Sequence, residues 1–162
     1  MKWIVTFIAL LATTMAFPRQ APDFDMETRE GGTYSLDSLR TPLTLLYLTN
    51  IDCDICEEAG DSIASSAVIG RAIADGQLTV LSVYVGSDRK GWLRREPRRQ
   101  WKECIDPAMS VYGIADYDFS YLPAFYIIDS SREIIASPQS VSGIEHALTD
   151  AGKGCNVKFC DK

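Results

Sequence analysis

Two apolar runs of strand length constrain the fold of this 162-residue chain more than any other feature. Apolar side chains are nearly continuous from Leu43 to Asn50 and again from Leu78 to Val85. Such runs are typical of strands that are covered on both faces of a sheet. Between them, small and apolar residues recur at helical spacing from Cys56 to Asp75, and Gly76 follows as a stop signal. A strand, a helix and a strand in this order indicate an α/β fold.

Shorter segments complete the predicted order of elements. Residues 24–39 alternate around Gly31 and Gly32, which predicts an N-terminal β-hairpin. Further segments have the pattern of regular elements: a short helix at 107–114, two strands joined as a hairpin at 123–129 and 132–137, and a last helix at 143–152. The expected fold is α/β, with a mixed central sheet flanked by helices and preceded by the hairpin.

The N-terminus has the pattern of a secretory signal peptide, assigned to residues 1–16. An apolar run from Trp3 to Leu11 follows a single lysine, and small residues precede a plausible cleavage point after Ala16. The alternative is a membrane anchor, although the run is shorter than the roughly 20 residues that span a bilayer. Export would place the protein in the periplasm or extracytoplasmic envelope, a compartment in which disulfides persist. The mature chain would then consist of a domain at 21–150 and a tail at 151–162.

Charge and its distribution bear on the partners. The net charge of -6 and the pI near 4.7 argue against a nucleic-acid partner, because such proteins present basic surfaces. Residues 89–102 nevertheless carry seven of the sixteen basic side chains. This polar insertion, helical in part and broken near Pro97, is either a solvated surface or a docking patch for an acidic partner. Trp92 and Trp101 are candidates to anchor it to the core.

Cys53 and Cys56 form a C-x-x-C pair where the first buried strand ends and a helix begins. The spacing alone fits a redox dithiol, half of a zinc site or a structural disulfide. At a helix N-terminus, however, the helix dipole stabilises the thiolate of Cys53. Cys56 lies one turn on, within reach of Cys53, as thiol–disulfide exchange requires. Such an exchanger needs no cofactor, because the electrons reside on sulfur.

Two stretches, "APDFDMETREGGTYSLDSLRTPLTLLYLTNIDCDIC" and "YLPAFYIIDSSREIIA", resemble the two signatures of thioredoxin-like proteins of the TlpA/ResA type. The resemblance spans roughly residues 21–148. It implies a thioredoxin-like fold and an exported thiol–disulfide oxidoreductase that acts on protein thiols or disulfides with a redox partner protein. It also implies a cis bond between Leu122 and Pro123, which faces the C-x-x-C pair. Pro123 would shape a substrate groove, and the backbone of Leu122 would pair with an extended peptide.

The sequence departs from that family at two positions. Asp52 stands where the family usually has tryptophan, and Tyr47 stands where many thioredoxins bury an acid. Proton transfer to Cys56 must then use another group or water. Glu57 and Glu58 are candidates, and the alternative is that both are solvated residues of the helix surface.

Four carboxylates surround the cysteine pair and are named the acidic collar: Asp52, Asp54, Glu57 and Glu58. Like-charge repulsion from the collar opposes a thiolate at Cys53 and raises its pKa, against the effect of the helix dipole. We therefore expect a more reducing couple than in strongly oxidising members of the family.

The remaining cysteines and the histidine have less specific assignments. Cys155 and Cys160 are interpreted as a local disulfide of the tail, or alternatively as the second half of a zinc site. Cys104 is expected as a buried apolar residue on a helix, with a regulatory or resolving role as the alternative. His146 is expected to be a surface or packing residue. The competing function is a thioredoxin-like binding or scaffold module whose C-x-x-C disulfide is structural.

Overall fold

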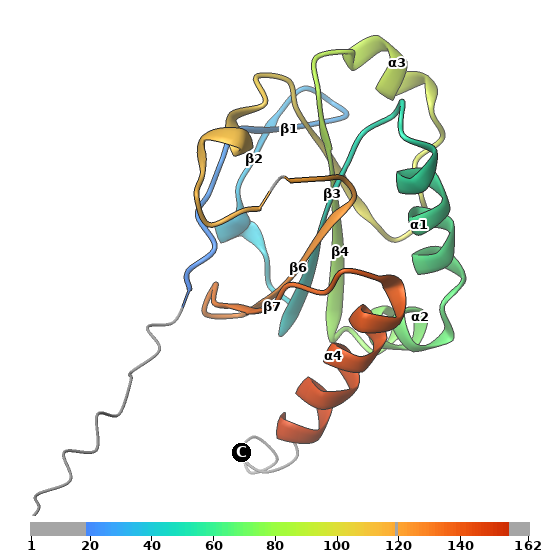
Figure 1. The fold of residues 1–162 in the computed structure, drawn as a ribbon, viewed down its shortest axis with the longest axis vertical. Helices are drawn as coiled ribbons and strands as arrows, with labels where there is room; N and C mark the ends of the chain where they lie inside the picture. Colours follow the sequence, from blue (N-terminus) through green and yellow to red (C-terminus); the bar gives the residue numbers. More distant parts are fainter. Residues whose placement is uncertain (1–18, 119, 156–162) are drawn as a thin grey trace, which may run out of the picture.

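A seven-stranded sheet organises the part of the chain that the structure describes (Figure 1). The computed structural model describes residues 19–118 and 120–155, with side chains through Gly152. The strand order is β2-β1-β5-β4-β3-β6-β7. The strands are β1 (Met26–Thr28), β2 (Thr33–Tyr34), β3 (Leu43–Thr49), β4 (Leu78–Val85), β5 (Lys102–Asp106), β6 (Ala124–Asp129) and β7 (Ile134–Ala136).

The two apolar runs form the centre of the sheet, as the sequence predicts. Strands β3, β4 and β5 are mutually parallel, and the outer strands add to them in antiparallel fashion. Leu45 and Leu46 are adjacent in β3, and both are fully buried. Because successive side chains point to opposite faces, both faces of this strand are covered. The predicted N-terminal hairpin is also present, with β1 and β2 paired across Gly31 and Gly32.

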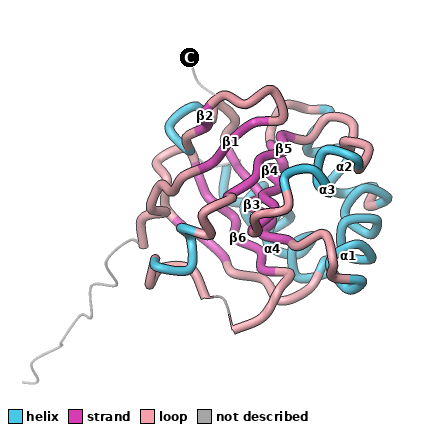
Figure 2. The backbone as a smooth tube through the Cα atoms, turned by 90° about the horizontal axis from the view of Figure 1, so that it is seen from above, coloured by secondary structure: helices cyan, strands magenta, loops and turns pink. Residues whose placement is uncertain are grey.

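Different kinds of structure cover the two faces. The helices α1 (Asp54–Ser65), α2 (Ala67–Ala74) and α4 (Val141–Cys155) pack on one face, around Leu45, Ile63 and Ile144. On the other face lie loops and two short 3-10 helices, at Leu36–Ser38 and Ser110–Gly113, which bury Phe24 and Val111. Helix α3 (Arg89–Arg94) follows β4 and lies at the opposite end of that strand from α2 (Figure 1); seen from above, α1, α2 and α3 fall on the same side of the strands (Figure 2). The expected flanking helices therefore cover one face.

The predicted helix from Cys56 to Asp75 is wrong in one respect, because Ser66 divides it into α1 and α2. Ser66 has an extended ψ of 122° and ends α1. Its hydroxyl accepts a hydrogen bond from the Ile69 amide and donates one to Glu145 of α4. A serine cap that a distant carboxylate supports leaves the helical spacing on both sides unchanged, so periodicity does not reveal the break. Gly76 ends α2 with a φ of +69°, as expected of a stop signal.

Strand β5 was not expected, and it corrects the assignment of Cys104. That residue is buried, as predicted, but it lies on a strand between β4 and β1 and not on a helix. Only Cys104, Ile105 and Asp106 of β5 are fully buried, so the apolar signal is too short to stand out beside the basic insertion. Asp106 is buried because its carboxylate accepts hydrogen bonds from the backbone amides of Ser110 and Val111.

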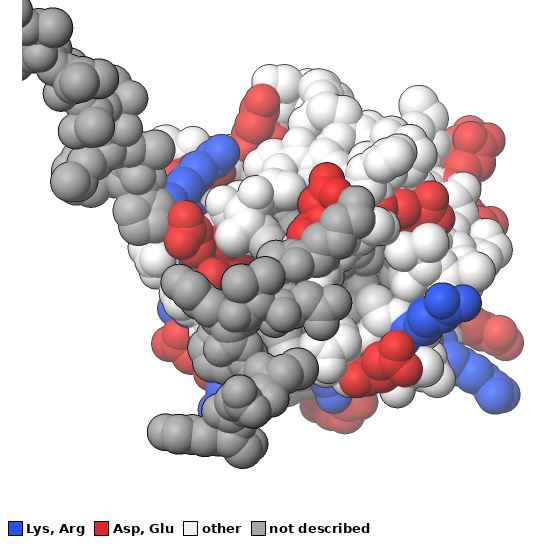
Figure 3. Space-filling model, turned by 90° about the horizontal axis from the view of Figure 1, so that it is seen from below, with Lys and Arg blue, Asp and Glu red and all other residues white. Residues whose placement is uncertain are grey.

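The last helix is longer than the predicted 143–152. It runs from Val141 to Cys155 and so includes the first residues of the predicted tail. No helix of the described residues is long and apolar enough to span a membrane. On the face shown in Figure 3, acidic and basic side chains are interspersed among uncharged ones.

Candidate redox site

Loops from several strands converge at one edge of the sheet. The parallel strands β3, β4 and β5 all end there, and the antiparallel β6 begins there. The register places Ala124, the first residue of β6, opposite Leu48, near the end of β3. The loop before α1 and the Leu122–Pro123 segment therefore lie at the same end of neighbouring strands. Ligand and reaction sites commonly form at this edge of α/β sheets.

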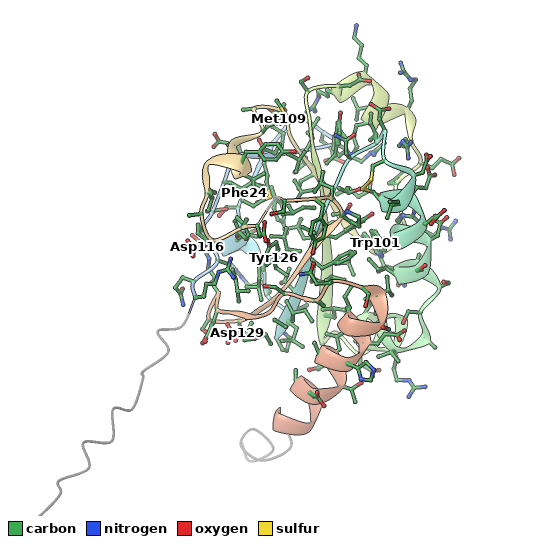
Figure 4. All side chains as sticks on the ribbon, viewed as in Figure 1. Phe24, Trp101, Met109, Asp116, Tyr126 and Asp129 are labelled. Atoms are coloured by element: carbon green, nitrogen blue, oxygen red, sulfur yellow. A yellow bond between two sulfur atoms is a disulfide. The ribbon has the colours of Figure 1, made fainter. Side chains whose placement is uncertain are left out.

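Cys53 and Cys56 form a disulfide at the start of α1, visible as the yellow bond in Figure 4. Cys53 is the N-cap of the helix, and its sulfur accepts a hydrogen bond from the Cys56 amide at 3.2 Å. Cys53 is half-buried, whereas Cys56 is only 1% exposed. The sulfur that an incoming molecule can meet is therefore that of Cys53. In the reduced form, the same amide and the helix dipole would stabilise its thiolate.

The loop that leads into the disulfide is held by Asn50, a residue that the sequence interpretation did not single out. Its side-chain amide donates to the Val85 carbonyl of β4, and its side-chain oxygen accepts from the Asp52 amide at 2.9 Å. Asparagine commonly organises a turn through such a bond to the backbone two residues on. In the sequence, the one feature that indicates this role is the position of Asn50 directly after an apolar strand.

Part of the basic insertion lies along α1, and we name residues 95–101 the arginine strap. Arg95 donates to the Ile51 carbonyl and pairs with Glu57 at 3.3 Å. One helical turn further on, Arg98 pairs with Asp61 at 2.8 Å. The strap therefore joins the loop before Cys53 to the outer surface of α1, a role that the sequence interpretation missed.

Small and aromatic residues allow this close approach. A side chain at Gly60 of α1 would meet the guanidinium of Arg98, since a Cβ there would lie 2.9 Å from it. The same guanidinium lies 5.3 Å from the centre of the Trp101 ring. Trp101 and the buried Trp92 both pack on core clusters, so the expected anchoring by the two tryptophans is confirmed.

Tyr47 lies beneath the cysteine pair in β3. Its hydroxyl donates a hydrogen bond to the backbone carbonyl of Cys56. Its ring stacks on Phe125 with centroids 5.4 Å apart and meets the edge of Trp101, labelled in Figure 4, at 6.1 Å. Burial raises the pKa of Tyr47, against smaller effects that include a hydrogen bond with Thr49, so the phenol is neutral at physiological pH.

The acidic collar is exposed to solvent. Glu57 pairs with Arg95, whereas the carboxylates of Asp52, Asp54 and Glu58 form no hydrogen bond or ion pair with the described residues. The exposure of Glu57 and Glu58 contrasts with the burial of Cys56. Their part in proton transfer stays a prediction.

The Leu122–Pro123 peptide bond is cis. Both residues are half-buried, and the preceding Tyr121 is 58% exposed. Since Ala124 pairs with Leu48, Pro123 lies next to the end of the strand that leads to Cys53. The two cysteines and the proline, far apart in sequence, are thus brought to one edge of the sheet.

The other residues named from the sequence lie away from this site or outside the description. Burial raises the pKa of the Cys104 thiol to about 12, which keeps it neutral and unreactive. His146 is exposed on α4. Cys155 is the last residue of α4, and Cys160 lies outside the described residues, so their disulfide stays a prediction. Within residues 19–118 and 120–155, no group of three or more histidine, cysteine or acidic side chains could hold a metal ion.

Comparisons with known proteins find similarity in structure. No family model matches the sequence, and no curated protein matches it. A thioredoxin-like protein from Bacteroides caccae matches with a TM-score of 0.73 and 23% identity over 81% of this chain, which spans 48% of that protein. A domain of a possible thiol-disulfide isomerase from Cytophaga hutchinsonii matches with a TM-score of 0.72 and 19% identity, over 86% of this chain and 95% of the other. The pneumococcal exposed lipoprotein thioredoxin from Streptococcus pneumoniae matches with a TM-score of 0.63 and 18% identity, over 80% and 99%. The fold of this chain is thioredoxin-like.

Proposed function

We propose that this protein is a thiol–disulfide oxidoreductase that exchanges disulfides with protein thiols outside the cytoplasm. The observation that carries the proposal is the disulfide at the start of α1, in which a half-buried Cys53 is joined to a buried Cys56. A pair in which one sulfur is accessible and the other is shielded suits exchange with large molecules, because only one sulfur then meets the substrate.

The reaction proceeds in two displacements with no cofactor. In the reducing direction, the Cys53 thiolate attacks a substrate disulfide, and one substrate sulfur leaves as a thiolate that takes up a proton. Cys56 then loses its proton and attacks the Cys53 sulfur of the mixed disulfide. The Cys53–Cys56 bond forms, and the second substrate sulfur leaves with the electron pair. The substrate gains two electrons and two protons, and a redox partner protein must later reduce the pair again.

Apolar side chains near the disulfide suit a protein substrate. Ile55, between the two cysteines, is 67% exposed, and Tyr121, just before Leu122 and Pro123, is 58% exposed. Exposed apolar residues beside a reacting group are typical of protein-binding surfaces. We propose that Pro123 shapes the groove between them and that the backbone of Leu122 pairs with an extended peptide.

Two observations support a location outside the cytoplasm. The N-terminal residues 1–16 have the pattern of a signal peptide. One structurally similar protein is described as an exposed lipoprotein thioredoxin. A disulfide formed in such a compartment persists until a thiol attacks it.

The second candidate is a thioredoxin-like binding or scaffold module in which the same disulfide is structural. The collar favours it, since unpaired carboxylates beside Cys53 disfavour the reactive thiolate. The reduction potential separates the two functions, because structural disulfides generally lie below about -300 mV.

Trapping tests the proposal directly. A Cys56→Ser variant cannot resolve a mixed disulfide, so we expect it to retain substrate proteins on Cys53 after extraction from the native envelope. The matched control is Cys53→Ser, which leaves only the buried sulfur of the pair, so Cys56 should retain no substrate protein. Equal capture by both variants, or a potential below about -300 mV with no capture, would support the scaffold instead.

A further inference from the structure

We propose that Tyr47 is a positioning residue for the resolving cysteine: its hydroxyl, bonded to the carbonyl of Cys56, holds the Cys56 sulfur in reach of Cys53. The inference rests on the proposed exchange function. Many thioredoxins bury an acid at the position of Tyr47, and the inference assigns a role to the tyrosine that stands there in this chain.

The ring of Tyr47 is fixed by contacts on two sides. It is 3% exposed, stacks on Phe125 at an interplanar angle of 19°, and meets Trp101 edge-on at 90°. Tyr47 and Phe125 are also direct partners in the β3–β6 ladder, so the stack belongs to the centre of the sheet. A ring held in this way gives its hydroxyl one position, and that position is at the carbonyl of Cys56.

The bond joins α1 to the sheet directly at Cys56. A backbone carbonyl has two lone pairs, so the Cys56 oxygen can accept from Tyr47 and still take part in the helix. The first turn of α1 is also held to Cys53 and to the arginine strap. The Cys56 amide contacts the Cys53 sulfur, the Glu57 amide donates to the Cys53 carbonyl, and the Glu57 carboxylate pairs with Arg95. Tyr47 is the attachment that reaches from the core.

Position matters for the second displacement of the reaction. When Cys53 carries a substrate sulfur, the Cys56 thiolate attacks the Cys53 sulfur, the new disulfide forms, and the substrate thiolate leaves with the electron pair. The rate of this step and its equilibrium both depend on the effective concentration of Cys56 at Cys53. Loosening the first turn of α1 lowers that concentration, so the mixed disulfide should accumulate.

The experiment compares Tyr47→Phe with Tyr117→Phe. Tyr117 is also 3% exposed, and its hydroxyl also donates to a backbone carbonyl, that of Pro22, in the core on the opposite face of the sheet. Each variant keeps its ring contacts and loses one hydrogen bond, so the two should lose similar stability in thermal unfolding. Each reduced protein is mixed with oxidised and reduced glutathione, quenched with acid and analysed by mass spectrometry for the Cys53–glutathione adduct.

For Tyr47→Phe we expect the equilibrium ratio of closed disulfide to glutathione adduct to fall about fivefold, the equivalent of about 1 kcal/mol for one hydrogen bond. The rate of adduct resolution should fall similarly, while the ratio for Tyr117→Phe should equal that of wild type. Equal ratios in all three proteins, or equal changes in the two variants, would overturn the inference. If the wild-type pair does not exchange with glutathione at all, the proposed function fails instead.

A second variant covers the case in which Tyr47→Phe does not fold. Site-specific 3-fluorotyrosine at position 47 keeps the hydroxyl and makes it a stronger donor, so the ratio should rise above that of wild type. A ratio equal to or below that of wild type would contradict the role of the bond.

Discussion

Replacing Arg95 by methionine should raise the pKa of the Cys53 thiol. Arg95 donates to the carbonyl of Ile51, two residues before Cys53, and pairs with Glu57 in the first turn of α1. Methionine keeps much of the apolar stem but removes the cation, so Glu57 joins the uncompensated carboxylates of the collar. Each of these changes disfavours a negative charge on Cys53.

The size of the shift follows from distance and exposure. A unit charge roughly 8 Å away, in a medium close to water, contributes about 0.5 kcal/mol, or about 0.4 of a pKa unit. The side chains of Arg95 and Glu57 are 46% and 55% exposed, so salt will reduce the effect further. We expect a rise of a few tenths of a pKa unit at low ionic strength, and less at high salt.

Arg98→Met is the matched control. Arg98 is also an arginine of the strap, and it also pairs with a carboxylate of α1, that of Asp61. Asp61, however, lies one turn beyond Glu57, about 6 Å further along the helix axis from Cys53. At that separation from Cys53, screening should remove most of the effect. Both variants lose an ion pair with a solvent-exposed carboxylate, worth about 0–1 kcal/mol, and methionine keeps much of the apolar stem of each arginine, so their unfolding free energies should differ little.

The assay measures the rate of Cys53 alkylation against pH in the reduced protein, with the modified peptide identified by mass spectrometry. This readout is specific to one cysteine, whereas thiolate absorbance would sum over several. No shift in Arg95→Met, or the same shift in Arg98→Met, would refute the electrostatic reasoning and leave the strap a purely mechanical support.

Further predictions concern the other thiols and the collar. At limiting alkylating reagent, Cys53 of the reduced protein should be labelled before Cys56, and Cys104 only after unfolding; first labelling of Cys56 would reverse the roles. Changing Asp52 and Asp54 to asparagine should lower the Cys53 pKa by less than one unit and make the couple more oxidising, as measured by alkylation and glutathione equilibration. The folded pKa of Cys104 is raised from 9.0 to about 12, so its stabilising contribution is present below pH 9 and is lost as pH rises toward 12. At pH 10, the unfolding free energy of wild type should therefore have fallen by about 1.4 kcal/mol more than that of Cys104→Ala, as measured by denaturant titration.

The parts of the fold that were predictable are those with a local signal. Continuous apolar runs revealed β3 and β4, and turn residues revealed both hairpins. The C-x-x-C pair after an apolar strand placed the disulfide at a helix start. Each of these inferences uses residues that are neighbours in the sequence.

The parts that were not predictable depend on contacts between distant residues. The break at Ser66 is supported by Glu145, 79 positions away, and the loop before Cys53 is held by Arg95, 44 positions from Ile51. Strand β5 exists because β4 and β1 pair with it on both sides, not because its own sequence is strongly apolar. A run of charged residues such as 89–102 indicates solvated surface unless the carboxylates that pair with it in the folded protein are known.

One insertion contacts the chain at or next to both positions where the sequence departs from the thioredoxin-like pattern. At position 52 an aspartate replaces a tryptophan, and at position 47 a tyrosine replaces a buried acid. The insertion between β4 and β5 brings an aromatic side chain close to each position: Trp92 packs with Ile51, the neighbour of Asp52, and Trp101 packs on the ring of Tyr47. The arginines of the insertion neutralise Glu57 and Asp61 of α1. Apolar contacts and positive charge from this insertion reach the loop before Cys53 and the helix that carries Cys56. Changes in the insertion should therefore alter the redox chemistry proposed for the cysteine pair, although the insertion contains no cysteine.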